Sequence, residues 1–129
     1  MRKTSTFIAM VLATGLAGCA GPQASGTYQS SASYDRLYAA SLAAVPAVGY
    51  TVTNASKADG LIVAQQGVML GHGSSVGLNA AISQERGTRI LWVTFVAPPG
   101  TMALGSFDEN IAEYVSAVKA RVPDVRPYP

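Results

Sequence analysis

Residues 89–97, Arg-Ile-Leu-Trp-Val-Thr-Phe-Val-Ala, decide the fold, because this stretch reads as a β-strand that is apolar on both faces. Successive side chains of a strand point to opposite faces. The two sets that result are Leu91, Val93 and Phe95 on one face and Ile90, Trp92, Thr94 and Val96 on the other. Because Thr94 is polar, we expect the second set to point outward and the first to lie in the core.

The segments before this strand favour an antiparallel sheet. Residues 50–54 alternate with period two, and residues 61–66 resume the pattern after a turn-forming segment. Residues 76–83 alternate in the same way and lead through a second turn into residues 89–97. Pro98 and Pro99 stop that strand, since proline cannot donate to a strand ladder. The sequence therefore predicts four strands arranged as two hairpins.

Helical patterns flank the four strands. Ser33 is a candidate N-cap, and an apolar stripe behind it predicts a helix over residues 34–47. Ser106 and Glu109 have the spacing of a capping box, and the stripe that follows ends at Pro123. The order helix, four strands, helix predicts an α+β fold with both helices on one face of an antiparallel sheet.

The first 18 residues have the pattern of a cleaved targeting segment. Arg2 and Lys3 precede an apolar run, Phe7 to Leu16, of about ten residues, whereas a membrane-spanning helix needs roughly twenty. Removing Arg2 and Lys3 from the nine basic residues leaves seven, which equals the number of acidic residues. The mature chain thus lacks the clustered basic excess that nucleic acid or an anionic lipid surface requires.

The segment Leu16-Ala17-Gly18-Cys19 resembles the lipobox of bacterial lipoproteins at every position. The resemblance implies that cleavage before Cys19 makes it the first residue of the chain. It also implies that Cys19 receives a diacylglyceryl group on its sulfur and carries fatty-acyl chains such as palmitate. Ala20 follows the cysteine where aspartate would favour the inner membrane, so the resemblance implies the periplasmic face of the outer membrane. Two or three acyl chains give stable membrane attachment. We therefore expect Cys19 to be the lipidation site and the membrane to be a partner.

The remaining chain divides into three parts on composition. Residues 19–33 comprise the lipidated cysteine and a Gly/Ser-rich stretch, which predicts a flexible tether with a span of about 20 Å. Residues 34–123 form one α+β domain, and residues 124–129 a Pro-rich tail. In layout the domain resembles the helix-grip style of accessory lipoproteins in outer-membrane assembly machinery. That resemblance implies a fold and names no activity.

The sequence offers little for catalysis. His72 is the only histidine and lies between Gly71 and Gly73, and nothing in the spacing makes a triad with Ser74, Ser75 or Asp59. The glycines of residues 71–77 are spaced one residue too far apart for a dinucleotide loop, and a strand follows them. With Cys19 acylated, a lone histidine leaves no set of metal ligands. We expect no enzyme activity, no cofactor and no metal.

Three functions remain open at this point. Ile90, Trp92 and Val96 form a candidate interface for a protein partner or a second copy, which predicts a non-enzymatic accessory lipoprotein. A carrier or sensor of a small apolar ligand is the alternative, and it would need an enclosed cavity of about 300 Å³. An envelope hydrolase would need a polar pocket around His72. The tether, the glycine-rich segment or the tail could instead cover the outward face.

Overall fold

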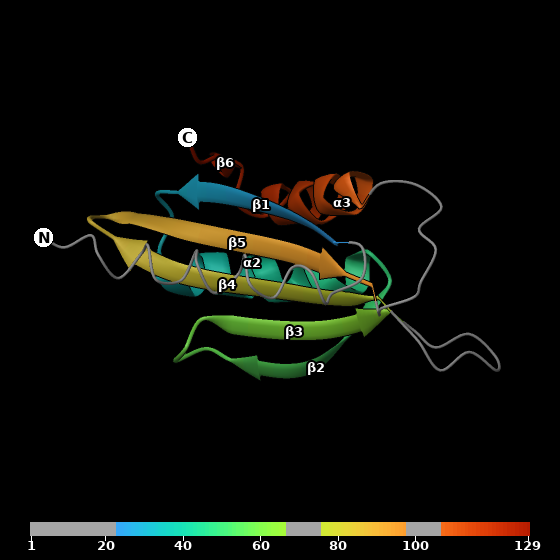
Figure 1. The fold of residues 1–129 in the computed structure, drawn as a ribbon. Helices are drawn as coiled ribbons and strands as arrows, with labels where there is room; N and C mark the ends of the chain where they lie inside the picture. Colours follow the sequence, from blue (N-terminus) through green and yellow to red (C-terminus); the bar gives the residue numbers. More distant parts are fainter. Residues whose placement is uncertain (1–22, 67–75, 98–106) are drawn as a thin grey trace, which may run out of the picture.

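The computed structural model describes residues 23–66, 76–97 and 107–129, and these residues form one antiparallel sheet with two helices on one side (Figure 1). The strands follow the order β2-β3-β4-β5-β1-β6 across the sheet. The α+β class is confirmed, but the sheet has six strands instead of the predicted four. The elements are β1 (Gln23–Ser30), α2 (Tyr34–Ala47), β2 (Tyr50–Ser56), β3 (Leu61–Gln66), β4 (Gly77–Glu85), β5 (Thr88–Val96), α3 (Asp108–Lys119) and β6 (Arg126–Pro127).

The two predicted hairpins are confirmed as β2–β3 and β4–β5. Their turns depend on residues with positive φ. Gly60 has φ +68° and lies against β4, where an added Cβ would overlap the Ile82 carbonyl oxygen. The Gly60 carbonyl accepts a hydrogen bond from the Ile82 N–H (2.8 Å), which ties the first turn to the second hairpin. Arg86 (φ 49°) and Gly87 (φ 82°) form the second turn.

The prediction of a flexible tether over residues 19–33 is wrong for Gln23–Ser30, which form β1 and pair with β5 along all eight residues. The small residue Gly26 leaves room in this strand for neighbouring side chains. A Cβ at Gly26 would lie 2.9 Å from Tyr28 Cε1 and 3.3 Å from Ile111 Cγ2, so only glycine fits beneath the tyrosine ring. Residues 19–22 lie outside the described residues.

The Pro-rich tail is also part of the sheet, so the predicted domain limits of 34 and 123 are too narrow. Arg126–Pro127 form β6, which pairs with β1 at Tyr28 and Gln29. The Tyr128 N–H donates to the Thr27 carbonyl (3.0 Å), which extends the contact by one residue. Both ends of the described chain therefore complete the same edge of the sheet.

Helix α2 begins as predicted, because the Ser33 hydroxyl accepts a hydrogen bond from the Arg36 N–H (3.2 Å). Helix α3 begins differently. Its N-cap is Phe107, which makes no side-chain cap hydrogen bond, and Ser106 lies outside the described residues. Asp108 and Glu109 instead supply acidic side chains to the first turn, where the helix dipole favours negative charge.

The core lies between the helices and the sheet and is filled by side chains. Leu91, Val93 and Phe95 are all fully buried there, which confirms the predicted inward face of β5. Tyr114 of α3 is fully buried as well, and its hydroxyl donates to the Ser41 carbonyl of α2 (2.7 Å). Burial raises the pKa of Tyr114 well above its ordinary value of 10.0, so the hydroxyl stays a donor.

Asp124 joins the tail to the connection between β1 and α2. The hydroxyl of Ser30, which is fully buried, donates to Asp124 Oδ1 (2.5 Å). The N–H and the hydroxyl of Ser31 both donate to Asp124 Oδ2 (2.9 Å each). These hydrogen bonds lower the pKa of Asp124 below its ordinary value of 3.8, and the bond from Ser30 has the largest effect.

Asp124→Asn is expected to remove a pH-dependent part of the stability. Because the folded-state pKa is depressed, this contribution is complete above the ordinary carboxyl pKa and is lost as the pH falls through the folded-state value. Urea midpoints of the variant should lie below wild type at pH 6, and the difference should shrink by pH 3. Glu85→Gln, an exposed acid at the end of β4 beside the β4–β5 turn, is the control and should show no such difference. A constant Asp124→Asn deficit from pH 6 to pH 3 would refute the linkage.

Candidate partner-binding face

On the side of the sheet opposite the helices, the part formed by the four central strands is here called the outer face. No helix of the described residues covers it (Figure 1). The register places its side chains in three rows that cross β1, β5, β4 and β3. Its twelve residues are Gln23, Ser25 and Thr27 of β1, Val96, Thr94 and Trp92 of β5, Gly77, Asn79 and Ala81 of β4, and Gln65, Val63 and Leu61 of β3.

Trp92 is the most prominent side chain of the outer face. It is 40% exposed, as predicted, because its neighbours in register are the small residues Thr27 and Ala81. Tyr128, which is 43% exposed, lies next to Thr27 through the backbone hydrogen bond of β6. Strands are about 4.8 Å apart, so the backbones at Trp92 and Tyr128 lie roughly 10 Å from each other on one row. Leu61 continues this row on the other side.

Ile90 is not part of the exposed surface, so this part of the predicted interface is wrong. It is 1% exposed, and Gln29 of β1 and Ser83 of β4 flank it in register. The Gln29 side chain is directed toward β6, where its amide donates to the Pro127 carbonyl (3.2 Å). The sequence alone could not indicate this neighbour, because β1 was not predicted. Val96, the third predicted residue, is half-buried between Gln23 and Gly77.

The outer face carries no charge. None of its twelve residues is Asp, Glu, Lys or Arg, and the polar ones are Ser, Thr, Asn and Gln. The hydroxyls of Ser25 and Thr94 lie 3.2 Å apart and form a hydrogen bond across β1 and β5. A combination of aromatic rings with short uncharged polar side chains is typical of protein-binding surfaces that adapt their hydrogen bonds to a partner.

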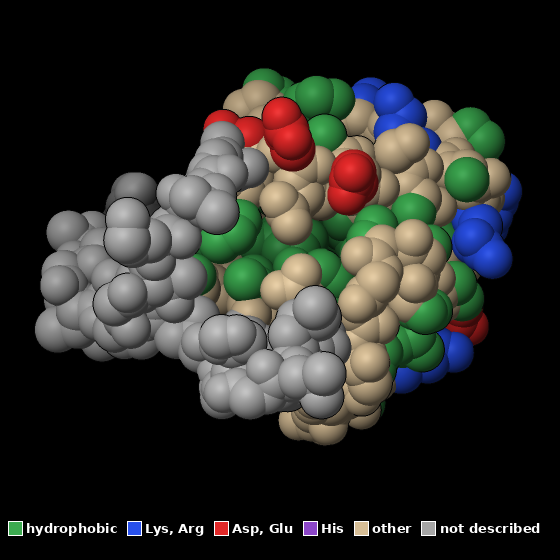
Figure 2. All heavy atoms as spheres, turned by 90° about the vertical axis from the view of Figure 1, so that its right-hand side faces the viewer, with side chains coloured by type: hydrophobic (Ala, Val, Ile, Leu, Met, Phe, Trp, Pro, Cys, Tyr) green, Lys and Arg blue, Asp and Glu red, His purple; other side chains and the backbone are tan. Residues whose placement is uncertain are grey.

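Charges are instead sorted between the two ends of the domain. The end where β1 begins, here called the Gln23 end, carries Asp108, Glu109 and Glu113 of α3 and no basic residue among those described. In the end-on view of Figure 2, acidic side chains face the viewer and Lys and Arg lie toward the rim. The opposite end holds both hairpin turns and is here called the turn end. Its basic residues are Arg36, Lys57, Arg86, Arg89, Lys119, Arg121 and Arg126.

The turn end is basic because its seven cations face only four acids, Asp35, Asp59, Glu85 and Asp124. Two of these acids form exposed ion pairs, Lys57 with Asp35 (3.2 Å) and Arg126 with Asp124 (3.7 Å). Arg36 donates to the Arg121 carbonyl (3.0 Å), which links the start of α2 to the segment after α3. The charges of the described domain are thus separated along the direction of its strands.

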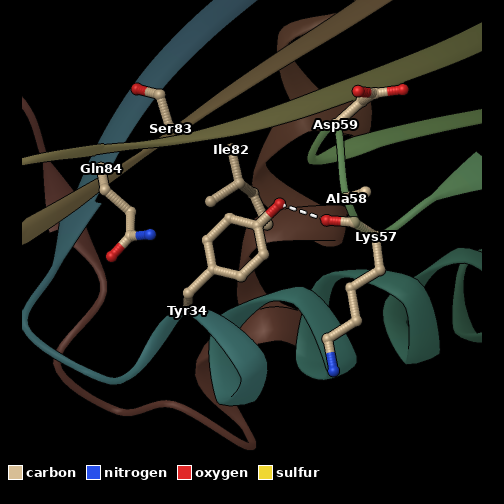
Figure 3. A pocket seen from close by; sticks show the side chains of 7 residues that line it. All are labelled: Tyr34, Lys57, Ala58, Asp59, Ile82, Ser83 and Gln84. Carbon is tan, nitrogen blue, oxygen red and sulfur yellow. Dashed lines mark hydrogen bonds between the residues drawn. The ribbon is translucent and has the colours of Figure 1, made fainter.

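Two open hollows lie on the surface of the described domain. The first, of about 540 Å³, lies at the turn end, where Tyr34 donates to the Lys57 carbonyl (2.6 Å) beside Ile82 and Gln84 (Figure 3). The second is lined by α2 and α3 and includes Ala117 and Val48. The lining of the first hollow mixes polar and apolar side chains, and the Tyr34 hydroxyl within it is already hydrogen-bonded to the chain. The first hollow lies between the start of α2 and β4 and opens at the turn end, and the second lies between the two helices, so neither is an enclosed cavity.

Most other candidate residues from the sequence lie outside the described part. These are Cys19, His72, Ser74 and Ser75. Asp59 is described: it lies in the β2–β3 turn, where Oδ2 accepts from the Ser56 hydroxyl (3.0 Å). Within the described residues, no group of three or more His, Cys, Asp or Glu side chains is placed to hold a metal ion. Over the same ranges, no helix is long and apolar enough to cross a membrane.

Comparisons with known proteins assign no family to this chain. No family model matches it, and no curated protein matches it. It is similar to the crystal structure of Ara h 8.0201. The TM-score is 0.42 with 10% identity, and the match covers 76% of this chain and 95% of that one. A likeness at this level carries no inference about function.

Proposed function

We propose that this chain is a lipid-anchored, non-enzymatic accessory protein of the cell envelope that binds a protein partner through the outer face of its sheet. The observation that carries the proposal is the exposed Trp92 on an uncharged face, in the row nearest the turn end. Tryptophan is enriched among residues that dominate binding energy, above all where small neighbours leave the ring accessible. Lipidation at Cys19, on the periplasmic side of the outer membrane, supplies the location.

Charge favours a protein over the other classes of partner. Nucleic acids and anionic lipid headgroups are bound through clustered Lys and Arg, and the outer face has neither. An uncharged partner surface that binds here would bury no unpaired charge of the outer face. The hollows described above give no support to an apolar-ligand carrier, because both are open to solvent and neither is an enclosed apolar cavity.

Trp92→Ser is expected to lower partner affinity by roughly 30-fold, the loss typical of a central aromatic contact worth about 2 kcal/mol. The native lipoprotein is purified in mild detergent, the proteins retained on it are identified, and binding of the purified partner is then titrated. Trp92 is the only tryptophan, so its emission should shift to the blue on binding.

Val52→Ser is the matched control. Val52 is 36% exposed, but it pairs with Ala64 on the helix side of the sheet at the β2 edge. This variant should bind the partner as wild type does. Equal affinity of wild type and Trp92→Ser would refute the proposed face. Binding that proves to be self-association would replace the foreign partner with a second copy.

A further inference from the structure

Strand β2 ends the sheet on the side away from β1 and β6. No strand of the described residues pairs with its other edge, here called the free edge (Figure 1). The residues from Thr51 to Ala55 are all exposed. Proteins usually protect such an edge with Lys or Pro, because its unpaired N–H and C=O groups accept a further strand. None of the seven residues of β2 is charged or proline, so the free edge is open to an added strand.

Val52 and Ala55 direct their backbone groups to the free edge. The Gly60 carbonyl accepts a hydrogen bond from its opposite residue on β4 (2.8 Å). Backbone groups alternate in direction along an antiparallel strand, so the even-numbered residues of β3 also face β4. Val52 lies opposite Ala64 in that set, and Ala55 lies opposite Ile62. The backbone groups of Val52 and Ala55 are therefore turned away from β3.

The side chains of the same two residues lie on the helix side of the sheet. Ala64 and Ile62, which they oppose, are fully buried there. The register shift between Val52 and Asn54 is a bulge, and it places Val52 and Ala55 on one face although they are three residues apart. The free edge thus combines unpaired backbone groups with exposed apolar side chains on one face.

We propose that a second copy of this chain pairs its β2 antiparallel to this β2, with Val52 opposite Ala55 of the second copy. The two-fold axis of such a pair is perpendicular to the sheet, so each contact occurs twice. In this register the backbone groups at the two free edges meet, and the apolar side chains pack on one another on the helix side. The six strands of each copy form one continuous sheet, with both outer faces on the same side.

Charge favours a second copy over a strand of another protein. Because β2 has no charged residue, no like charges meet across the two-fold axis. The register also places Lys57 opposite Tyr50 of the second copy, shortly after its α2 ends at Ala47. The last turn of α2 contains no basic residue, so the negative end of its dipole lacks a cation. Lys57 can supply one, since its exposed ion pair with Asp35 contributes little.

Disulfide cross-linking tests the register. Asn54 and Thr51, both exposed on β2, are each replaced by cysteine in the full lipoprotein, which is purified in mild detergent and oxidised with copper phenanthroline. The wild-type chain, with Cys19 as its one cysteine, gives the background. We expect N54C to form covalent dimers several-fold more than T51C does. Asn54 lies beside the two-fold axis, whereas the two Thr51 residues lie at least roughly 13 Å apart, beyond the limit of about 7 Å for a disulfide.

Val52→Lys tests the pairing itself. A lysine on an edge strand opposes strand addition, so we expect the dissociation constant of the dimer to rise at least about ten-fold in sedimentation velocity of the detergent-solubilised lipoprotein. Gln84→Lys, an exposed position on β4 away from the free edge, is the control and should leave the constant unchanged.

Three results would overturn the β2 pairing. They are equal cross-linking of N54C and T51C, unchanged self-association of Val52→Lys, and cross-linking of N54C to a different protein, which would make the added strand foreign. Trp92→Ser should dimerise as wild type does, because Trp92 is on β5 and not at the free edge. Failure of the partner-binding face is therefore distinguishable from failure of this pairing.

Discussion

Phe95→Ser is expected to destabilise the domain by at least about 4 kcal/mol, since the cavity left by a buried phenyl ring and an unsatisfied buried hydroxyl act together. Phe95 is fully buried, and its ring lies edge-on to Tyr50 with centroids 5.5 Å apart. Trp92→Ser should cost less than about 1.5 kcal/mol, because the indole is already 40% exposed and leaves no closed cavity. Urea unfolding followed by circular dichroism ranks the two variants.

A loss of 4 kcal/mol approaches the whole stability of a small domain, so Phe95→Ser could fail to fold. Phe95→Leu keeps most of the apolar volume and should unfold at an intermediate urea concentration. If Trp92→Ser unfolded at a lower urea concentration than Phe95→Leu, with the tryptophan emission of the wild-type monomer already blue-shifted, Trp92 would be a core residue. The partner-binding face would then lose its main support.

Cys19→Ala is expected to abolish membrane attachment. Acyl chains supply nearly all the membrane affinity in the proposed function. The chain left after cleavage before Cys19 would have seven basic and seven acidic residues, so it would have no basic excess that could bind the membrane in their place. Fractionation of cells that express the variant should move the protein from the membrane pellet to the soluble fraction. Retention in the pellet after high-salt washing, with the targeting segment removed, would contradict the lipobox interpretation.

Ala20→Asp serves as the control for this experiment. The sorting rule implied by the lipobox resemblance predicts that the variant stays lipidated and sediments with membranes, but with the inner one. Separation of the two membranes on a density gradient therefore tests location independently of attachment. Loss of Ala20→Asp from both membranes would show that the substitution disturbs processing.

The hairpins were predictable because each strand alternates and each turn contains residues that tolerate positive φ. The turns at Gly60 and Gly87 are examples, and β3, β5 and α2 lie within a residue or so of the predicted limits. Strand β1 was not predicted, because its inward positions, Ala24, Gly26 and Tyr28, include only one large apolar side chain and so give a weak period-two signal. The glycine that makes the segment read as a linker is the residue on which Tyr28 packs.

The candidate face was predictable only in part, for the same reason. Alternation within β5 placed Trp92 correctly, since it depends on that strand alone. Ile90 was misplaced because its neighbour Gln29 belongs to the unpredicted strand, and Tyr128 was missed because it joins the face through β6. The outward position of Leu61 and Val63 was predictable in principle. Residues 61–64 are all apolar, and alternate side chains of a strand point to opposite faces, so two of the four must point outward.

The position of β1 between β5 and β6 has a consequence for solubility. Without residues 23–30, β5 would become an edge strand of nine residues, with unpaired N–H and C=O groups beside an apolar sequence. Long apolar edges of this kind recruit strands from other molecules and lead to aggregation. A recombinant chain trimmed to residues 34–123 would have this exposed edge. Cleavage before Cys19, which the lipobox resemblance implies, would leave residues 23–30 in place and so keep β5 shielded.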